Sequence, residues 1–264
     1  MNFWQAIILG IIQGATEFIP ISSSGHLVLI REFLGWQDSG IALDIMLHLA
    51  TLLAILFYFR EKIGKIIKGL GRREPASWRL AGGIILATLP AVLAGYFGAD
   101  LVEKYFRSAG AVGLLMICAG IIFILIEKRQ AKQQAVKSQE VLTWADYLWI
   151  GIAQAAAILP GVSRSGATIA AGMGRKMARK KSAEFSFLLA IPAIFGAGFY
   201  DLLKHRQDLE IISVSFLLGF IASFVVGYLS IHFLIRYLKT RGLNIFAYYL
   251  WILGSIAIIF SLWQ

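Results

Sequence analysis

The stretch QGATEFIPISSSGH, residues 13–26, interrupts apolar sequence with a carboxylate, several hydroxyls and an imidazole. Gln13 and Glu17 lie four positions apart, so they share one face of a helix. Pro20 cannot continue that helix, and the serines and glycine after it suit a turn and a new helix N-cap. Non-helical backbone at membrane depth is tolerated only where protein packs around it or where it lines a wet cavity. In a membrane, this stretch therefore predicts a helix break, in a segment that either spans the bilayer or dips in and returns.

A second stretch of the same kind is PGVSRSGAT, residues 160–168. It contains Arg164, and an arginine at membrane depth costs at least about 2.5–3.5 kcal/mol on insertion scales. The planar guanidinium suits bidentate binding of phosphate. The hydroxyls of Ser163, Ser165 and Thr168, with the free backbone N–H groups of the helix that follows, add donors for an oxyanion.

The composition is that of a membrane protein. Hydrophobic residues make up 58% of the 264 residues and charged residues 15%, whereas soluble domains are about 45–50% apolar and about 25% charged. Six apolar runs each have room for a spanning helix of roughly 17–25 residues. These runs are 41–59, 80–98, 110–126, 185–203, 211–235 and 245–263. We therefore expect residues 1–264 to form a single polytopic membrane domain.

The distribution of basic residues predicts the orientation. Nineteen of the 25 Lys and Arg residues lie in the segments 60–79, 127–143, 175–181 and 236–241. Basic residues collect in cytoplasmic loops, and this explains the net charge of +10 without a nucleic-acid partner. The segment 144–174 then has both ends inside and must return to the face that it entered. The segment 1–30 ends outside.

An internal repeat predicts the path of that first segment. At an offset of 141, Gly10 and Gln13 match Gly151 and Gln154, and the Ser22–Gly25 cluster matches Ser163–Gly166. We expect repeat one at about 1–126, a cytoplasmic connector at about 127–143 and repeat two at about 144–264. The predicted fold is all-α, with six full spanning helices plus two re-entrant helical hairpins in two inverted-topology repeats. Such repeats place their site near the bilayer midplane. In this chain we expect the site to open to the outer side of the membrane. The alternative is that the few matching residues reflect chance similarity and not a repeat.

These two motifs, supported by SAEFSFLLA at residues 182–190, resemble the undecaprenyl-diphosphate phosphatase family of the bacitracin-resistance type, over essentially the whole length. The resemblance implies hydrolysis of undecaprenyl diphosphate to undecaprenyl phosphate and inorganic phosphate in the bacterial cytoplasmic (inner) membrane. This reaction recycles the carrier lipid for cell-wall synthesis and confers bacitracin resistance. It also implies a divalent cation, Mg²⁺ or Ca²⁺. Many family members have glutamate where this chain has Gln13, so Glu17 alone would share the cation with the substrate diphosphate.

The resemblance and the local chemistry together predict roles for ten residues. Ser23 is the expected nucleophile, with His26 as its proton acceptor and Arg164 on the phosphate. Glu17 would orient His26 or hold the cation. The expected substrate-binding residues are Gln13, Ser22, Ser24, Ser163, Ser165 and Thr168. Attack by His26 or by water stays open, as does the oligomeric state, for which a homodimer is one candidate.

Two other interpretations stay open. Arg164 and Glu17 could pair only to lock the two halves together. Inverted repeats with broken helices are also a transporter architecture, so the cavity could move a polyisoprenyl phosphate between leaflets, alone or in addition to hydrolysis. A carrier needs no nucleophile beside a base, and the pair Ser23 and His26 therefore favours an enzyme. As weaker candidates, we expect Asp44 and His48 at the cavity mouth and Glu184 in a pair with a basic residue.

Overall fold

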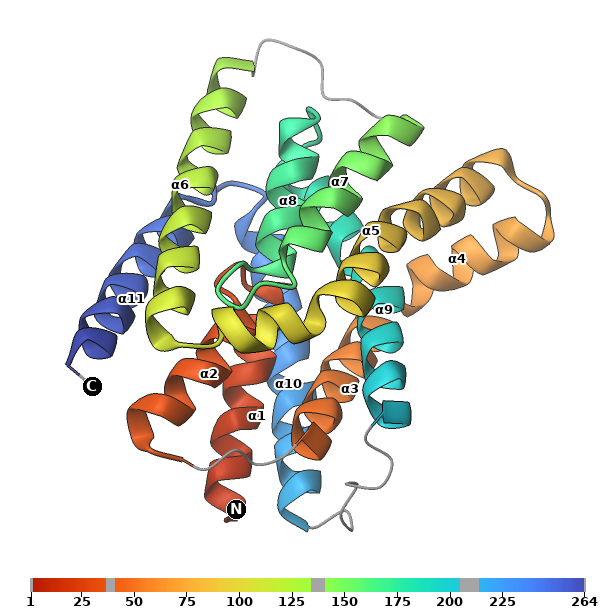
Figure 1. The fold of residues 1–264 in the computed structure, drawn as a ribbon. Coiled ribbons are helices and arrows are strands. Elements are labelled where there is room, and N and C mark those ends of the chain that lie inside the picture. The colour runs from red at the N-terminus through yellow and green to blue at the C-terminus, as the bar shows by residue number, and fades with distance from the viewer. Residues whose placement is uncertain (1, 37–40, 134–140, 205–213, 264) are drawn as a thin grey trace.

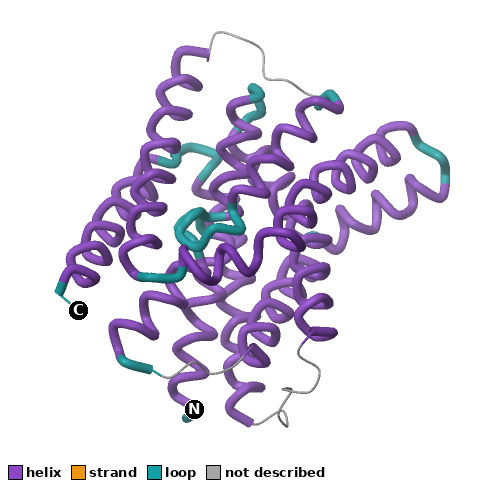
Figure 2. The backbone as a smooth tube through the Cα atoms, in the orientation of Figure 1, coloured by secondary structure: helices purple, strands orange, loops and turns teal. Residues whose placement is uncertain are grey.

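The structure, a computed structural model, describes residues 2–36, 41–133, 141–204 and 214–263. These residues form helices and no strand (Figures 1 and 2). In chain order the helices are α1 (Phe3–Phe18), α2 (Ser23–Leu34), α3 (Ile41–Tyr58), α4 (Arg60–Gly71), α5 (Pro75–Phe106), α6 (Ala109–Gln133), α7 (Trp144–Ala156), α8 (Arg164–Gly174), α9 (Arg179–Lys204), α10 (Val214–Tyr237) and α11 (Asn244–Leu262). The predicted all-α class is confirmed for this part of the chain.

Five of these helices are long and apolar enough to cross a membrane, namely α5, α6, α9, α10 and α11. Helix α3 joins them as a sixth only if it is counted with α4, from which a 73° bend separates it. The expectation of a loop at 60–79 was wrong. Residues 60–71 form α4, and α5 begins at Pro75, where the missing N–H of proline is harmless. Helix α4 and the start of α5 project from the bundle as a pair (Figure 1).

Two helices are broken where the sequence places proline and serine. The first break separates α1 from α2 and the second separates α7 from α8. Helix α1 packs along α10, and α7 packs along α5. The end of α6 and the start of α7 lie at the upper end of Figure 1, whereas the N-terminus lies at the lower end. Both broken helices thus reach the middle of the bundle from opposite ends.

Local features recur at the spacing found in the sequence. Helix α1 begins with a capping box at Asn2, and α7 begins with one at Thr143, 141 positions later. Gly113 of α6 and Gly254 of α11 are also 141 positions apart. A Cβ added at Gly113 would lie 2.5 Å from the carbonyl oxygen of Gly254, and one added at Gly254 would lie 2.6 Å from that of Gly113. The two last helices of the halves therefore cross in reciprocal contact.

The outer faces of the long helices are apolar. Phe97, Phe195 and Ile252 are each at least 60% exposed, and exposed apolar area on this scale marks contact with a partner or a membrane. Cys118 of α6 is also exposed.

Candidate active site

The first helix break carries an unusual backbone. Helix α1 ends at Phe18, and α2 begins at Ser23 with Ser22 as its N-cap. Ser22 has φ +71° and ψ 96°, a conformation that L-residues rarely adopt. Its hydroxyl accepts from the backbone N–H of Gly25 at 3.3 Å and from that of Gly161, in the other break, at 3.1 Å. The two hairpins are therefore joined directly at their turns.

The second break mirrors the first. Ser163 is the N-cap of α8, and its hydroxyl accepts from the backbone N–H of Gly166 at 3.1 Å, as Ser22 does from Gly25. Arg164 is the first residue of α8. Thr168 donates to the carbonyl of Arg164 at 2.8 Å and lies 2.6 Å from the hydroxyl of Ser186. Thr168 thus braces the start of α8 against α9.

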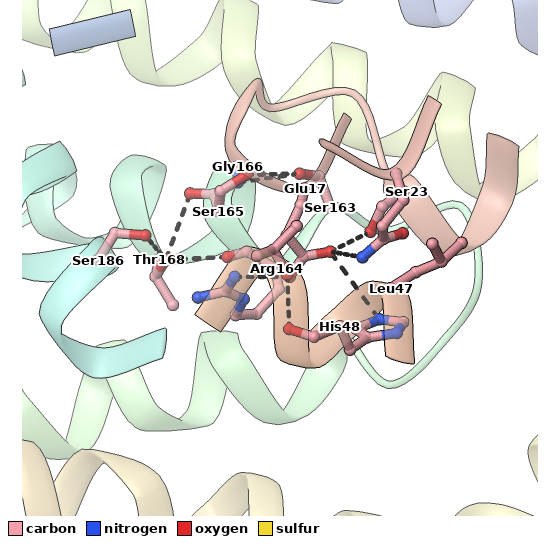
Figure 3. A network of polar contacts seen from close by, with 12 residues as sticks. Glu17, Ser23, Leu47, His48, Ser163, Arg164, Ser165, Gly166, Thr168 and Ser186 are labelled. Atoms are coloured by element: carbon pink, nitrogen blue, oxygen red, sulfur yellow. Dashed lines mark hydrogen bonds and ion pairs between the residues drawn. The ribbon is translucent and has the colours of Figure 1, made fainter. Parts of the chain in front are cut away.

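Glu17 lies at the centre of the polar network (Figure 3). Its Oε1 accepts from Nη2 of Arg164 at 2.8 Å. Its Oε2 accepts from the hydroxyl of Ser23 at 2.5 Å and from Nε2 of Gln13 at 3.1 Å, and lies 3.9 Å from Nε2 of His48. Both carboxylate oxygens are thus engaged, and the first hairpin meets the second through a buried ion pair.

Arg164 retains one unused donor nitrogen. Its Nη1 is buried and has no hydrogen-bond partner among the described residues. An unmatched buried donor is costly, and native structures explain such groups with a ligand, water or ion. Arg164 also lines the cavity described below. Its guanidinium can therefore hold Glu17 with one nitrogen and offer the other to an oxyanion.

The expected contact between Ser23 and His26 is not present in the structure. The hydroxyl of Ser23 donates to Glu17 and not to the imidazole. Nδ1 of His26 lies 2.7 Å from the carbonyl oxygen of Ser22, and Nε2 lies 2.7 Å from the hydroxyl of Tyr249 in α11. The sequence suggested a pair because Ser23 and His26 lie one turn apart, but the ring leans back toward Ser22.

A cavity of about 520 Å³ opens onto the network. Ligand pockets commonly have volumes of about 300–1,000 Å³. The expected site residues that line it are Glu17, Ser22, Ser23, Ser24, Ser163 and Arg164, whereas Gln13, His26, Ser165 and Thr168 do not. Its remaining walls are largely small or apolar side chains of α5 and α9, among them Val92, Gly95, Tyr96, Ala193 and Ala197. A polar floor with apolar walls suits a charged headgroup on a hydrocarbon chain.

The three weaker candidates, Asp44, His48 and Glu184, lie in different surroundings. His48 lines the cavity, as expected. Asp44 is not among the lining residues, and its carboxylate is held by Arg31. Glu184 pairs with Lys62 at 2.6 Å and with Lys180 at 3.3 Å, so the expected basic partner is confirmed. Sequence reasoning missed Tyr249, whose position in an apolar span gives no signal of its contact with His26.

The donors present do not make a metal site on their own. Among the residues that the structure describes, no three or more His, Cys, Asp or Glu side chains come together to hold an ion. Glu17 supplies one carboxylate at the network, and both of its oxygens already accept hydrogen bonds. A divalent cation fits here only if most of its ligands come from elsewhere, and Mg²⁺ commonly takes them from substrate phosphates and water.

Comparison with known proteins gives a consistent result. The sequence model of the family described as bacitracin resistance protein BacA matches residues 6–256. A protein of Desulforudis audaxviator named undecaprenyl-diphosphatase is 41% identical over 263 residues, which cover 99% of each chain. Proteins of the same name are 40% identical in Pelotomaculum thermopropionicum, over 99% of this chain and 97% of the relative, and 39% identical in Aliivibrio salmonicida, over 97% of each.

Proposed function

The chain belongs to the bacitracin resistance protein BacA family, and we propose that it is an undecaprenyl-diphosphatase whose reaction takes place between Glu17, Ser23 and Arg164. The products are undecaprenyl phosphate and inorganic phosphate, and the reaction recycles a carrier lipid for cell-wall synthesis. The observation that carries the proposal is the buried Nη1 of Arg164, which has no hydrogen-bond partner among the described residues. The carboxylate that Arg164 holds, Glu17, also accepts from the hydroxyl of Ser23. Transport of the lipid finds no support, since the relatives are named as hydrolases of the diphosphate.

The apolar walls of the cavity accommodate the first isoprene units and leave the diphosphate on the polar floor. Arg164 binds the terminal phosphate through Nη1, and the N-terminus of α8 adds backbone N–H groups and a partial positive charge. Fixed positive groups of this kind stabilise the charge on the transferring phosphoryl group, which is most of what phosphoryl transfer requires.

The short contact between Ser23 and Glu17 supplies the nucleophile and its base. As Oγ of Ser23 attacks the terminal phosphorus, its proton passes to Oε2 of Glu17, 2.5 Å away. The bond between that phosphorus and the bridging oxygen breaks, and undecaprenyl phosphate leaves with the bonding electrons. Water then hydrolyses the phosphoserine, releases inorganic phosphate and restores the hydroxyl. Because His26 faces Ser22 and Tyr249, neither step uses its imidazole.

A divalent cation, Mg²⁺ or Ca²⁺, would be held jointly by Glu17 and the substrate diphosphate. It would neutralise phosphate charge that Arg164 alone leaves uncompensated.

We further propose the finer architecture that the sequence predicts, with six spans and two hairpins in two inverted repeats. The recurring features 141 positions apart and the matched packing of α1 on α10 and of α7 on α5 support it. In this arrangement the site opens to the outer face of the bacterial inner membrane. In a Cys118→Ser background, an impermeant thiol reagent should label Ser24→Cys in intact cells. It should label Arg73→Cys only after permeabilisation, and the reverse pattern would contradict the orientation.

The enzymatic proposal is tested by inorganic phosphate released from C55 isoprenyl diphosphate by the purified chain in detergent. The C55 monophosphate serves as the control substrate and should release none. Equal release from both would indicate a different enzyme.

A further inference from the structure

His26 is fixed at both ring nitrogens. The carbonyl oxygen of Ser22 can only accept, so Nδ1 of His26 carries the proton in that 2.7 Å contact. In a neutral ring Nε2 then accepts from the hydroxyl of Tyr249, at 2.7 Å. The two rings also stack, with centroids 5.6 Å apart and planes within 6°. Contact with Ser23 would require the imidazole to give up one of these bonds.

The residue that His26 holds is the strained one. Ser22, at φ +71°, sits in a region of the backbone map that costs about 1–3 kcal/mol and persists only where its surroundings determine it. Its carbonyl accepts from the backbone N–H of His26 at 3.1 Å as well as from Nδ1. With the two bonds to its hydroxyl, four hydrogen bonds fix this one residue.

The direction of Ser23 depends on that turn. Ser23 is the next residue in the chain and the first of α2, and its hydroxyl must lie within reach of Glu17 at the end of α1. Rotation about Ser22 changes the direction of Ser23 relative to α1. Tyr249 belongs to α11, in the opposite half of the chain, so its bond to His26 ties the turn to a separate part of the bundle.

We propose that His26 and Tyr249 are positioning residues that hold the strained turn at Ser22, and thereby keep Ser23 against Glu17, while no proton is transferred at the imidazole. This inference rests on the proposed function. It assigns Tyr249 a role in turnover although it lies outside the cavity.

The test compares kcat and KM for C55 isoprenyl diphosphate among full-length variants of equal melting temperature. Tyr249→Phe keeps the stacked ring and loses the hydroxyl. It should lower kcat about three- to tenfold, the effect of one hydrogen bond, with KM unchanged. Tyr248→Phe is the matched control, because Tyr248 is 53% exposed and packs on Trp251, and it should match the native chain.

His26→Asn decides whether the imidazole takes a proton. Asparagine cannot act as a base at neutral pH, but its amide can donate to the carbonyl of Ser22 as Nδ1 does. We expect the kcat of His26→Asn to lie within about tenfold of the native value, because the loss corresponds to one hydrogen bond. The double variant with Tyr249→Phe should be no slower than His26→Asn alone, since Tyr249 acts only through His26.

Three outcomes would overturn the inference. The first is a loss of kcat of about 10³-fold or more in folded His26→Asn, as expected for a missing general base or nucleophile. The second is a kcat of Tyr249→Phe equal to that of Tyr248→Phe. The third is additive losses of kcat in the double variant.

Nitrogen NMR of ¹⁵N-histidine-labelled protein tests the hydrogen bonds of His26 without an activity measurement. His26 should be the neutral Nδ1–H tautomer, and Tyr249→Phe should shift its Nε2 signal while Tyr248→Phe does not. If the native chain releases no phosphate, the proposed function fails, and this spectrum still confirms or refutes the anchor.

Discussion

Arg164 and Glu17, 147 positions apart in the chain, meet at 2.8 Å between Nη2 and Oε1 where the two broken helices face each other. The pair alone would be a structural lock. Two features point beyond a lock. Nη1 of Arg164 has no partner in the part of the chain that the structure describes, and the hydroxyl of Ser23 donates to the other carboxylate oxygen. The ion pair therefore also orients a phosphate-binding group and a base around one cavity.

Ser23→Ala should lower kcat by about 10³-fold or more, because the nucleophile is lost. Ser255→Ala is the matched control. Ser255 lies in α11, is exposed and does not line the cavity, so its loss should change kcat by less than about threefold. Rapid-quench labelling with substrate that carries ³²P in the terminal phosphate should trap a phosphoserine in the native chain and none in Ser23→Ala. Unchanged turnover in Ser23→Ala would exclude the serine mechanism.

Glu17→Gln should destabilise the fold as well as stop turnover. It leaves the charge of Arg164 buried without a counterion, a change that typically costs about 3–5 kcal/mol. Glu103→Gln is the control, since Glu103 pairs with Arg107 in an exposed contact worth about 0–1 kcal/mol. Chemical unfolding of both variants in one detergent measures the difference. Equal free energies of unfolding would mean that the Glu17–Arg164 pair contributes little to stability.

Glycines at helix crossings should not tolerate a methyl group. A Cβ at Gly151 would lie 2.6 Å from the carbonyl oxygen of Ala87 and 2.8 Å from its Cα, both backbone atoms. Gly151→Ala should therefore lower the free energy of unfolding by about 1–3 kcal/mol. Gly98→Ala meets no atom within 4 Å and should be neutral or slightly stabilising, by up to about 1 kcal/mol. A Gly151→Ala variant as stable as Gly98→Ala would contradict the close packing of α7 on α5.

Removal of divalent cations should stop turnover without destabilising the protein. The described residues form no ion site of their own, so chelation with EDTA should leave the melting temperature unchanged. Gln13→Glu adds a carboxylate beside Glu17, where Nε2 of Gln13 now lies 3.1 Å from Oε2. It should lower the Mg²⁺ concentration for half-maximal activity. A cation dependence that is the same in Gln13→Glu would place the ion away from this corner of the site.

Much of the architecture could be predicted because its signals are local. Apolar runs predicted the long helices, and Pro20 and Pro160 with their serines predicted both breaks. Helix α4 was missed because its basic residues suggested a loop. Its apolar residues in fact recur at helical spacing, as at Ile63, Ile66, Ile67 and Leu70.

The residues that form the site could be predicted from the sequence, but the contacts between them could be predicted less well. The chemistry of each motif, together with the family resemblance, identified Glu17, Ser23 and Arg164, and the structure brings all three together. The partner of His26 could not be predicted, because Tyr249 is 223 positions away and lies in an apolar span without a polar pattern. Helical spacing placed Ser23 near His26, but it could not show that the ring leans back toward Ser22.

The most direct test is phosphate release from C55 isoprenyl diphosphate by the purified chain, with and without EDTA, for the native protein and Arg164→Ala. Arg236→Ala, at the end of α10, is the control for loss of a basic residue outside the cavity. We predict steady release by the native chain and by Arg236→Ala, and a loss of about 10²-fold or more on chelation or in Arg164→Ala. A folded native chain that binds the lipid and releases no phosphate, or an Arg164→Ala variant with native turnover, would contradict the account.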